Sequence, residues 1–328
     1  MESTKITLAS KPNAQLAINT YKPKDPHRLP YPLDKTLLVF LNGLAAPQSS
    51  WGPTINLLLE KDDINPVPAL VTYDRYGQGA SDPDPSDPPD TPYGHDAAAV
   101  INDLYHLLMR VIPDIVHMDA PGQCRSTRIV FVCNSIGCPL ARLYAAANPG
   151  TVAGFLFLDS MMANSDFVSV QPDPDAADFD PAPVPEGISV DDLRHAREQY
   201  RKFFHPTVPN GEKFDRRDMP QRLPFADKPL LPPGPDGKPP VVYVAGHDFD
   251  RFAQDGQEGF MHIPKAVTNA YMNPAWHEYN RGLTKLTTRD NSPKEPVIAE
   301  GCGHVIQLGS PGFVAEQVTK LLSKLREG

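Results

Sequence analysis

The fold is decided by the stretch Ile129-Val130-Phe131-Val132-Cys133-Asn134-Ser135-Ile136-Gly137. Its apolar run predicts a strand that is buried on both faces, and the residues that follow have the composition of a helix. A serine at such a junction, with a small residue two positions later, is typical of a nucleophile elbow. The helix N-terminus at this point favours developing negative charge. Two interpretations are open: Ser135 is a nucleophile, or it only caps the helix.

Further apolar runs lie on both sides of this stretch and alternate with helical patterns. Strands that are apolar throughout and alternate with helices indicate a mostly parallel sheet covered by helices on both faces, which is an α/β fold. The first two predicted strands are short and compatible with a hairpin. The predicted strands span residues 5–10, 15–21, 37–41, 68–73, 128–133, 152–158, 240–245 and 296–299, and the predicted helices span 93–112, 139–147, 190–204, 275–286 and 311–325.

Residues 161–239 break this alternation. The stretch is rich in Asp and Pro, with one helix-like segment near its middle. Proline fixes φ and removes an amide donor, so it disfavours helix interiors and central strands. A long insertion inside a compact α/β unit is usually a lid or cap over a site. We therefore expect a core domain formed by residues 1–160 and 240–328, with a cap formed by 161–239.

Composition limits the possible partners. A chain of 328 residues, 40% of them hydrophobic, can bury a large core, and its net charge of −9 disfavours binding to nucleic acid or to an anionic membrane surface. No apolar run approaches the roughly 18 residues needed to span a bilayer. The first residues lack the apolar centre of a signal peptide. We expect a cytoplasmic protein, and nothing in the sequence indicates its oligomeric state.

The sequence gives no sign of a metal or cofactor site. No pair of cysteines has CxxC spacing and no cluster has zinc-ligand spacing. His262 and His277 stand apart and are expected on the surface or in ordinary packing, and no glycine-rich phosphate loop follows a strand. We expect free, mostly buried thiols at Cys124, Cys133, Cys138 and Cys302.

Two turns follow the earlier strands. The turn Leu41-Asn42-Gly43-Leu44 is placed where a backbone amide commonly faces the oxyanion of the tetrahedral intermediate in acyl transfer. We predict an oxyanion hole formed by the amides of Leu44 and Ile136, with Gly43 beside them; an ordinary turn is the alternative. The second turn, Tyr73-Asp74-Arg75-Tyr76-Gly77-Gln78-Gly79-Ala80-Ser81, is expected to support the fold without contributing chemistry.

Three motifs occur in an order typical of one enzyme superfamily: Asp74-x-x-Gly77-x-Gly79-x-Ser81, Asn134-Ser135-x-Gly137 and Gly301-Cys302-Gly303-His304. On these motifs the chain resembles the α/β-hydrolase superfamily, in particular its members with a core domain and a cap. The resemblance runs from Leu37 to the C-terminal helix and leaves the 161–239 segment unmatched. It departs from the usual pattern at Cys133, which replaces the first glycine of the elbow, and at Asn42, which replaces a histidine.

The resemblance implies Ser135 as nucleophile and His304 as its base. Imidazole is needed because a serine hydroxyl is a weak nucleophile until its proton can leave to a neighbour. A carboxylate must then orient the imidazole, and the superfamily carries it after the strand that follows the elbow or one strand later. We favour Asp248, at the later and commoner place, over Asp159 at the earlier one, with Asp250 third.

We expect a serine hydrolase that cleaves a carboxylic ester or lactone through an acyl-enzyme, without a cofactor. Dehalogenases and epoxide hydrolases of this superfamily carry aspartate at the elbow, so Ser135 argues against both. Two alternatives remain: a C–C bond hydrolase or another non-ester reaction on the same residues, and a ligand-binding receptor with vestigial turnover. A water-excluding pocket suits a medium-sized, largely apolar substrate. We expect the substrate to contact Asn42, Trp51, Phe167, Tyr200, Phe204 and Trp276.

Overall fold

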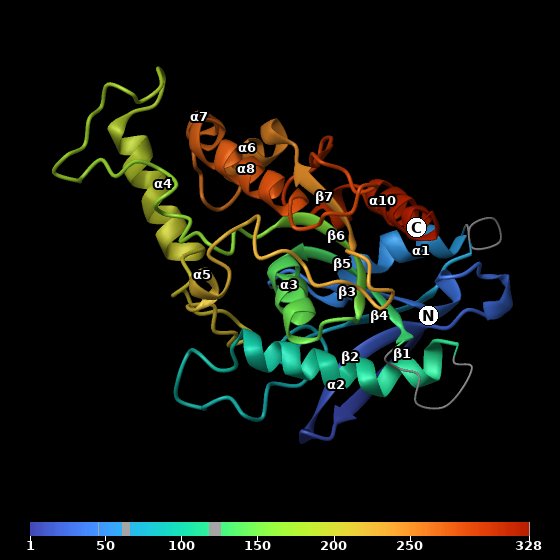
Figure 1. The fold of residues 1–328 in the computed structure, drawn as a ribbon. Coiled ribbons are helices and arrows are strands. Elements are labelled where there is room, and N and C mark those ends of the chain that lie inside the picture. The colour runs from blue at the N-terminus through green and yellow to red at the C-terminus, as the bar shows by residue number, and fades with distance from the viewer. Residues whose placement is uncertain (45, 61–65, 118–125, 328) are drawn as a thin grey trace.

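The fold is built on one eight-stranded sheet with the strand order β1-β2-β4-β3-β5-β6-β7-β8. The computed structural model in Figure 1 describes residues 1–44, 46–60, 66–117 and 126–327. The first two strands form an antiparallel hairpin, the second pairs antiparallel with β4, and all other neighbours are parallel. The strands are β1 (Glu2–Leu8), β2 (Lys11–Tyr21), β3 (Thr36–Leu41), β4 (Ala69–Tyr73), β5 (Arg128–Ser135), β6 (Val152–Ser160), β7 (Val241–His247) and β8 (Val297–Ala299).

Helices cover the sheet on both faces (Figure 1). Helices α2, α3 and α8 contribute to the hydrophobic core on one face, and α1 and α10 to the core on the other. The helices are α1 (Gly52–Glu60), α2 (Ala97–Ile115), α3 (Gly137–Ala147), α4 (Val190–Phe203), α5 (Met219–Arg222), α6 (Phe249–Glu258), α7 (Lys265–Val267), α8 (Asn273–Thr284), α9 (Ile306–Gly309) and α10 (Pro311–Arg326).

Strand β3 shows why its apolar run has no polar face. Successive side chains of a strand point to opposite faces of the sheet. Leu37, Val39 and Leu41 enter the core under α2 and α3, whereas Leu38 and Phe40 enter the core under α1 and α10. All six residues of the strand are buried. The predicted α/β fold, with a mostly parallel sheet covered on both faces, is confirmed.

Some helix boundaries differ from the predicted ones. Helix α2 begins at Ala97 rather than at residue 93, because the Asp96 side chain accepts from the Ala99 amide and caps the helix there. The sequence patterns missed α1 and α6. Helix α6 is largely polar and begins directly after Asp248, so the sequence shows no long row of apolar residues at helical spacing that would predict it.

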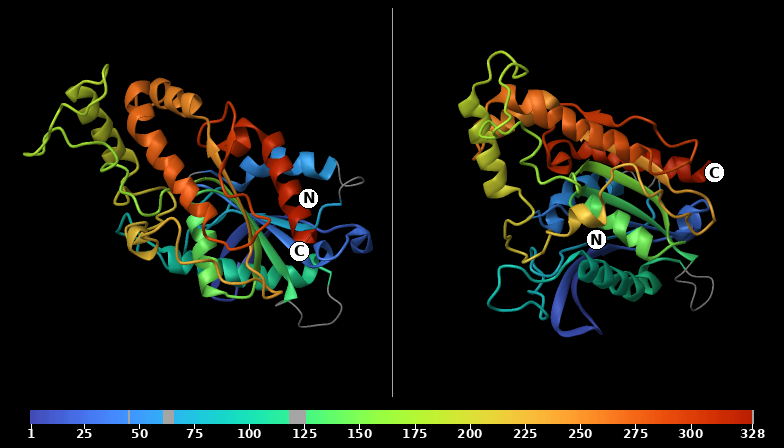
Figure 2. Two further views of the ribbon diagram at one scale, coloured as in Figure 1. Left: turned by 45° about the horizontal axis from the view of Figure 1, so that its top comes forward. Right: turned by 60° about the vertical axis from the view of Figure 1, so that its left-hand side comes forward.

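The 161–239 segment connects β6 to β7. It contains α4, which starts with a capping box between Ser189 and Asp192, and the short α5. In Figure 1 and in both views of Figure 2, α4 and its flanking loops extend beyond the sheet. The segment therefore reaches outward from the edge of the sheet where β6 ends.

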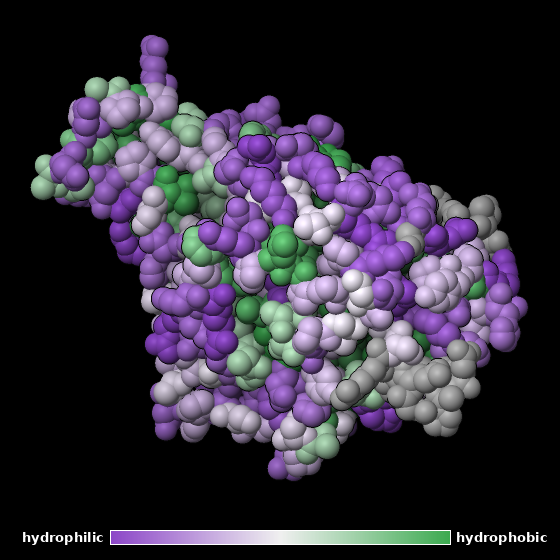
Figure 3. Space-filling model, in the orientation of Figure 1, coloured by the Kyte–Doolittle hydropathy of each residue, from purple (hydrophilic) through white to green (hydrophobic). Residues whose placement is uncertain are grey.

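Three of the cysteines can be compared with the expectation of free, buried thiols. Cys133, Cys138 and Cys302 are free and buried, and Cys124 lies outside the described residues. No helix within the described residues is both long and apolar enough to cross a bilayer. The face of the molecule seen in Figure 3 is mostly hydrophilic, with small apolar patches near its centre.

Candidate active site

Ser135 lies at the tight junction between β5 and α3. Its φ of 54° is in the left-handed region, which costs a residue with a Cβ about 1–3 kcal/mol. Gly137 makes the junction possible, because a Cβ there would lie 2.5 Å from the carbonyl oxygen of Leu41 in β3. The serine is partly exposed at the edge of the sheet. This geometry is the strained strand-to-helix turn predicted from the sequence.

Asn134 ties the serine turn to the loop that carries His304. Its side-chain amide donates to the carbonyl oxygen of His304 at 3.0 Å and to that of Leu158 in β6 at 3.1 Å. Because Asn134 precedes Ser135 directly, the backbone of the His304 loop is held against the serine turn. Asn134 itself is buried, so its amide group is shielded from solvent.

His304 is paired with Asp159. Its Nδ1 lies 2.6 Å from Asp159 Oδ2, and the ring packs against Trp276 with centroids 5.1 Å apart. Trp276 is itself fixed, because its Nε1 donates to the Ser160 carbonyl at 2.8 Å. The His304 side chain is 28% exposed, whereas Asp159 is fully buried at the end of β6. The arrangement gives His304 a carboxylate on one ring nitrogen and access to the surface.

The favoured acid, Asp248, does not make this contact. Helix α6 begins at the next residue, and the Asp248 carboxylate accepts from the amides of Arg251 and Gly301, each at 3.0 Å. These backbone hydrogen bonds lower the pKa of Asp248. Asp250, the third candidate, has a side chain that is 87% exposed. The preference for Asp248 is therefore corrected: it caps a helix, and the alternative, Asp159, is the carboxylate beside the imidazole.

Asp159 also contacts a second histidine. His247 Nδ1 lies 2.9 Å from both carboxylate oxygens, and the His247 amide donates to Oδ1 at 3.3 Å. Burial alone would raise the pKa of Asp159, but the charge of His247 and the hydrogen bonds from His247 and His304 hold it well below its usual range. The carboxylate is therefore ionised at neutral pH.

The turn after β3 is anchored through its carbonyl groups. Arg75 donates from Nη1 to the Asn42 carbonyl at 2.8 Å and from Nη2 to the Gly43 carbonyl at 2.9 Å. Gln78 adds a second donor to the Gly43 carbonyl, also at 2.9 Å. In a trans peptide the N–H points away from the C=O, so these bonds fix the direction of the Leu44 amide.

Gly43 places this turn against the serine, since a Cβ there would lie 3.3 Å from the Cβ of Ser135. The Ile136 amide lies at the start of α3, one residue after the serine. Within the described part of the chain, neither the Leu44 amide nor the Ile136 amide has a backbone acceptor. The two predicted donors thus lie on the turn after β3, which packs against Ser135, and on the residue that follows Ser135.

Arg75 also connects this turn to the 161–239 segment. Glu212 accepts from Arg75 Nε at 2.9 Å and from Nη2 at 3.0 Å, and Gln78 donates to it at 2.9 Å. Arg75 and Glu212 are both buried. Burial would lower the pKa of Arg75, but the charge and hydrogen bonds of Glu212 raise it. The ion pair is bidentate, which is the geometry that best supports a buried guanidinium.

The predicted substrate contacts divide into two groups. Trp51 is fully buried against Phe40, and its Nε1 donates to Asn42 Oδ1 at 2.8 Å. The Asn42 amide donates to the Tyr73 carbonyl at 2.8 Å and to Gln78 Oε1 at 2.9 Å. Both residues belong to the packed interior, so the prediction that they bind substrate is corrected.

The remaining predicted aromatic residues lie together near His304. Phe167 contacts Trp276 and Phe204 at centroid distances of 5.7 and 6.2 Å, and Tyr200 contacts Phe204 at 5.9 Å. They come from the 161–239 segment and from α8, so the fold joins two parts of the chain in one aromatic cluster.

A cavity of about 560 Å³ opens beside His304. Its lining includes Tyr200 from α4, Phe252 from α6, and Leu308 from α9. Phe260 and Leu308 are 65% and 57% exposed, so apolar surface lies at its mouth. Ser135 is not among the described residues that line it, so the cavity approaches the site from the side of the imidazole.

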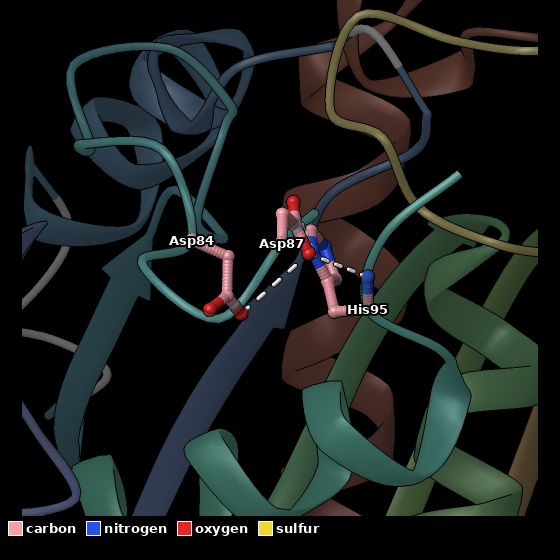
Figure 4. Close-up of side chains that lie close together, drawn as sticks. All are labelled: Asp84, Asp87 and His95. Carbon is pink, nitrogen blue, oxygen red and sulfur yellow. Dashed lines mark hydrogen bonds and ion pairs between the residues drawn. The ribbon is translucent and has the colours of Figure 1, made fainter. Parts of the chain in front are cut away.

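A cluster of possible metal ligands lies elsewhere, formed by Asp84, Asp87 and His95 (Figure 4). His95 Nδ1 is 3.1 Å from both Asp87 oxygens and 3.7 Å from Asp84. The ammonium group of Lys11 forms an ion pair with Asp84 and a second one with Asp103 at 2.6 Å. A cation is therefore supplied by the chain itself, and the cluster closes the hairpin onto α2.

Several contacts of the site were missed in the sequence. Arg75 and Gln78 lie in a motif that was expected only to support the fold, and their contact with the Asn42-Gly43 turn has no local signature. Glu212 is separated from Arg75 by 137 positions. His247 carried a usable signal, because it ends a buried strand at the same sheet edge as Ser135.

Comparisons with known proteins agree with this architecture. A sequence model described as "Alpha/beta hydrolase family" matches residues 38–317. The chain has no match among the curated proteins searched. Among solved structures, a thermophilic esterase from Thermogutta terrifontis with malate bound is 16% identical, with a TM-score of 0.54 and 99% of each chain covered.

Two further structures show the same likeness. Alpha/beta hydrolase domain-containing protein 10 from mouse is 11% identical, with a TM-score of 0.55 over 99% of this chain and 100% of that one. An epoxide hydrolase from Vigna radiata is 12% identical, with a TM-score of 0.50 over 98% of both chains. At these identities the likeness extends to the fold alone.

The buried Arg75–Glu212 pair generates a stability prediction. In Glu212→Gln the guanidinium loses its counter-charge inside the protein, which costs roughly 3–5 kcal/mol of unfolding free energy. Urea denaturation and the melting temperature measure the loss. Glu295→Gln is the matched control, because Glu295 pairs with Arg281 at the surface and its side chain is 67% exposed. Equal, small losses of unfolding free energy in both variants would contradict a large contribution of the buried pair to stability.

Proposed function

Because the chain belongs to the alpha/beta hydrolase family, we propose that it is a serine hydrolase that cleaves a carboxylic ester or lactone. The observation that carries the proposal is the short contact between His304 and the buried Asp159 carboxylate, next to a strained serine turn. A carboxylate on Nδ1 leaves Nε2 as the proton acceptor for a serine hydroxyl. In this division of roles Ser135 is the nucleophile, His304 is the base, and Asp159 is the carboxylate that orients the imidazole.

The reaction proceeds in two halves. Ser135 Oγ attacks the carbonyl carbon while His304 Nε2 takes its proton, and the imidazolium then protonates the departing alcohol oxygen. Water attacks the resulting acyl-enzyme, again giving a proton to His304, and the acid leaves as Ser135 recovers its proton. Asp159 remains ionised throughout and stabilises the imidazolium.

The Leu44 and Ile136 amides are the proposed oxyanion donors. Removing one such donor costs about 2.7–4 kcal/mol of transition-state stabilisation in a well-studied protease. The value of these donors depends on fixed directions, because a donor that must reorient loses much of its advantage. The Arg75 and Gln78 bonds to the Gly43 carbonyl support that fixed direction for Leu44.

The proposed substrate is medium-sized and largely apolar. The cavity beside His304 falls in the range of about 300–1,000 Å³ that is typical of small-molecule sites. Aromatic side chains and Leu308 line it, and Tyr200 brings the 161–239 segment to its wall. We assign that segment the role of a cap on this basis.

Turnover of simple esters tests the proposed function. The purified protein should hydrolyse at least one of p-nitrophenyl acetate, butyrate and octanoate, or a lactone of similar size. In Ser135→Ala the rate should fall by at least roughly 10⁴-fold, because the nucleophile is lost. Ser49→Ala, at an exposed serine, should keep the wild-type rate. Full activity in Ser135→Ala, or a folded wild-type protein inert toward every ester and lactone, would contradict the proposal.

A pair of variants identifies the acid. In Asp159→Asn the imidazole loses the carboxylate that sets its tautomer, so kcat should fall by roughly 10⁴-fold. In Asp248→Asn the helix keeps a good N-cap residue, so the rate should stay close to wild type. Steady-state kinetics of both variants, with circular dichroism to verify folding, make the comparison. The opposite ranking would assign the acid to Asp248.

A further inference from the structure

His247 is a buried histidine with an oxygen at each ring nitrogen. It ends β7 and is 2% exposed. Its Nδ1 lies 2.9 Å from the Asp159 carboxylate, and its Nε2 lies 3.0 Å from Asn273 Oδ1 in α8. A neutral imidazole carries only one N–H, so it can donate to only one of two acceptors.

The orientation of the Asn273 amide is fixed by its other contacts. Its nitrogen donates to the Phe249 carbonyl at 3.0 Å and to Asn269 Oδ1 at 2.7 Å. A carbonyl oxygen can only accept, so the nitrogen must face Phe249 and the oxygen must face His247. Both partners of His247 are therefore acceptors, and the ring satisfies both only when it carries two protons.

The surroundings identify what compensates this charge. Phe252 stacks on the ring at 4.1 Å and Trp276 meets it edge-on at 5.6 Å, so α6 and α8 give it apolar walls. The charged or titratable groups that face it are Asp159, the neighbouring Asp248, and His304 across the Asp159 carboxylate. Burial would lower the pKa of His247, but the Asp159 carboxylate raises it.

We propose that His247 remains an imidazolium at working pH and is a positioning residue that holds the Asp159 carboxylate and partly offsets its charge toward His304. The inference rests on the proposed function for its kinetic consequence, but the protonation state of His247 follows from the hydrogen bonds alone. The Asp159 carboxylate then contacts two imidazoles that have different roles. His247 is a fixed cation, and His304 is the group that gains and loses a proton.

The positive charge of His247 should influence the pH dependence of the reaction. A positive charge on the far side of Asp159 opposes the formation of a second positive charge on His304. Removing it should shift the acidic limb of the kcat/KM profile to higher pH. A purely structural role for His247 would lower the rate without moving that limb.

The first test needs no activity. In uniformly ¹⁵N-labelled wild-type protein, both ring nitrogens of His247 should show imidazolium chemical shifts at neutral pH, where an ordinary histidine is largely neutral. The assignment comes from the signals lost in His247→Asn. A neutral ring at about pH 7 would overturn the proposal, whether or not the protein hydrolyses esters.

The second test measures the pH profile of His247→Asn, which keeps a neutral donor beside Asp159. The acidic limb of kcat/KM should move up by about one pH unit. His262→Asn is the control, because His262 is exposed and its φ of 50° is tolerated by asparagine. A limb unmoved in a folded, active His247→Asn variant would overturn the electrostatic role. Absent activity in the wild-type protein would instead count against the proposed function.

Discussion

The buried carboxylate of Asp159 is the constraint on which the site depends. An ionised group with no exposure must be surrounded by donors, because an uncompensated buried charge is very costly. Its donors come from three other parts of the chain: His247 at the end of β7, Asn280 in α8 and His304 in the loop after β8. The carboxylate therefore joins the end of β6 to these three segments at one edge of the sheet.

The surrounding backbone serves the same arrangement. Ser135 and Asp159 both have positive φ, 54° and 43°, at the ends of neighbouring parallel strands. Strain of this kind persists only where the surrounding contacts overdetermine it. Asn134 bridges from the serine turn to the His304 loop, and the Arg75–Glu212 pair links the turn after β3 to the 161–239 segment. Strained turns and buried polar bonds thus converge on a single edge.

The fold and part of the site could be predicted from the sequence because their signals are local. Apolar runs predict strands buried on both faces, and the motifs around Ser135 and His304 indicate two site residues without knowledge of the fold. The carboxylate that contacts His304 could not be identified from local sequence, because Asp248 and Asp159 each follow a buried strand. What separates them is the immediate start of α6, which uses Asp248 as its cap. The prediction that Trp51 binds substrate was wrong for a related reason, because the local sequence does not show whether an aromatic residue near the turn is buried.

The most direct measurement of the central claim is the site of covalent labelling by a fluorophosphonate. The protein would be labelled to completion, digested, and the modified peptide sequenced by mass spectrometry. We expect a single adduct on Ser135, because only an activated serine hydroxyl displaces the leaving group at an appreciable rate. Labelling of a different residue, or an unlabelled protein that still hydrolyses esters, would contradict the assignment of Ser135 as the nucleophile.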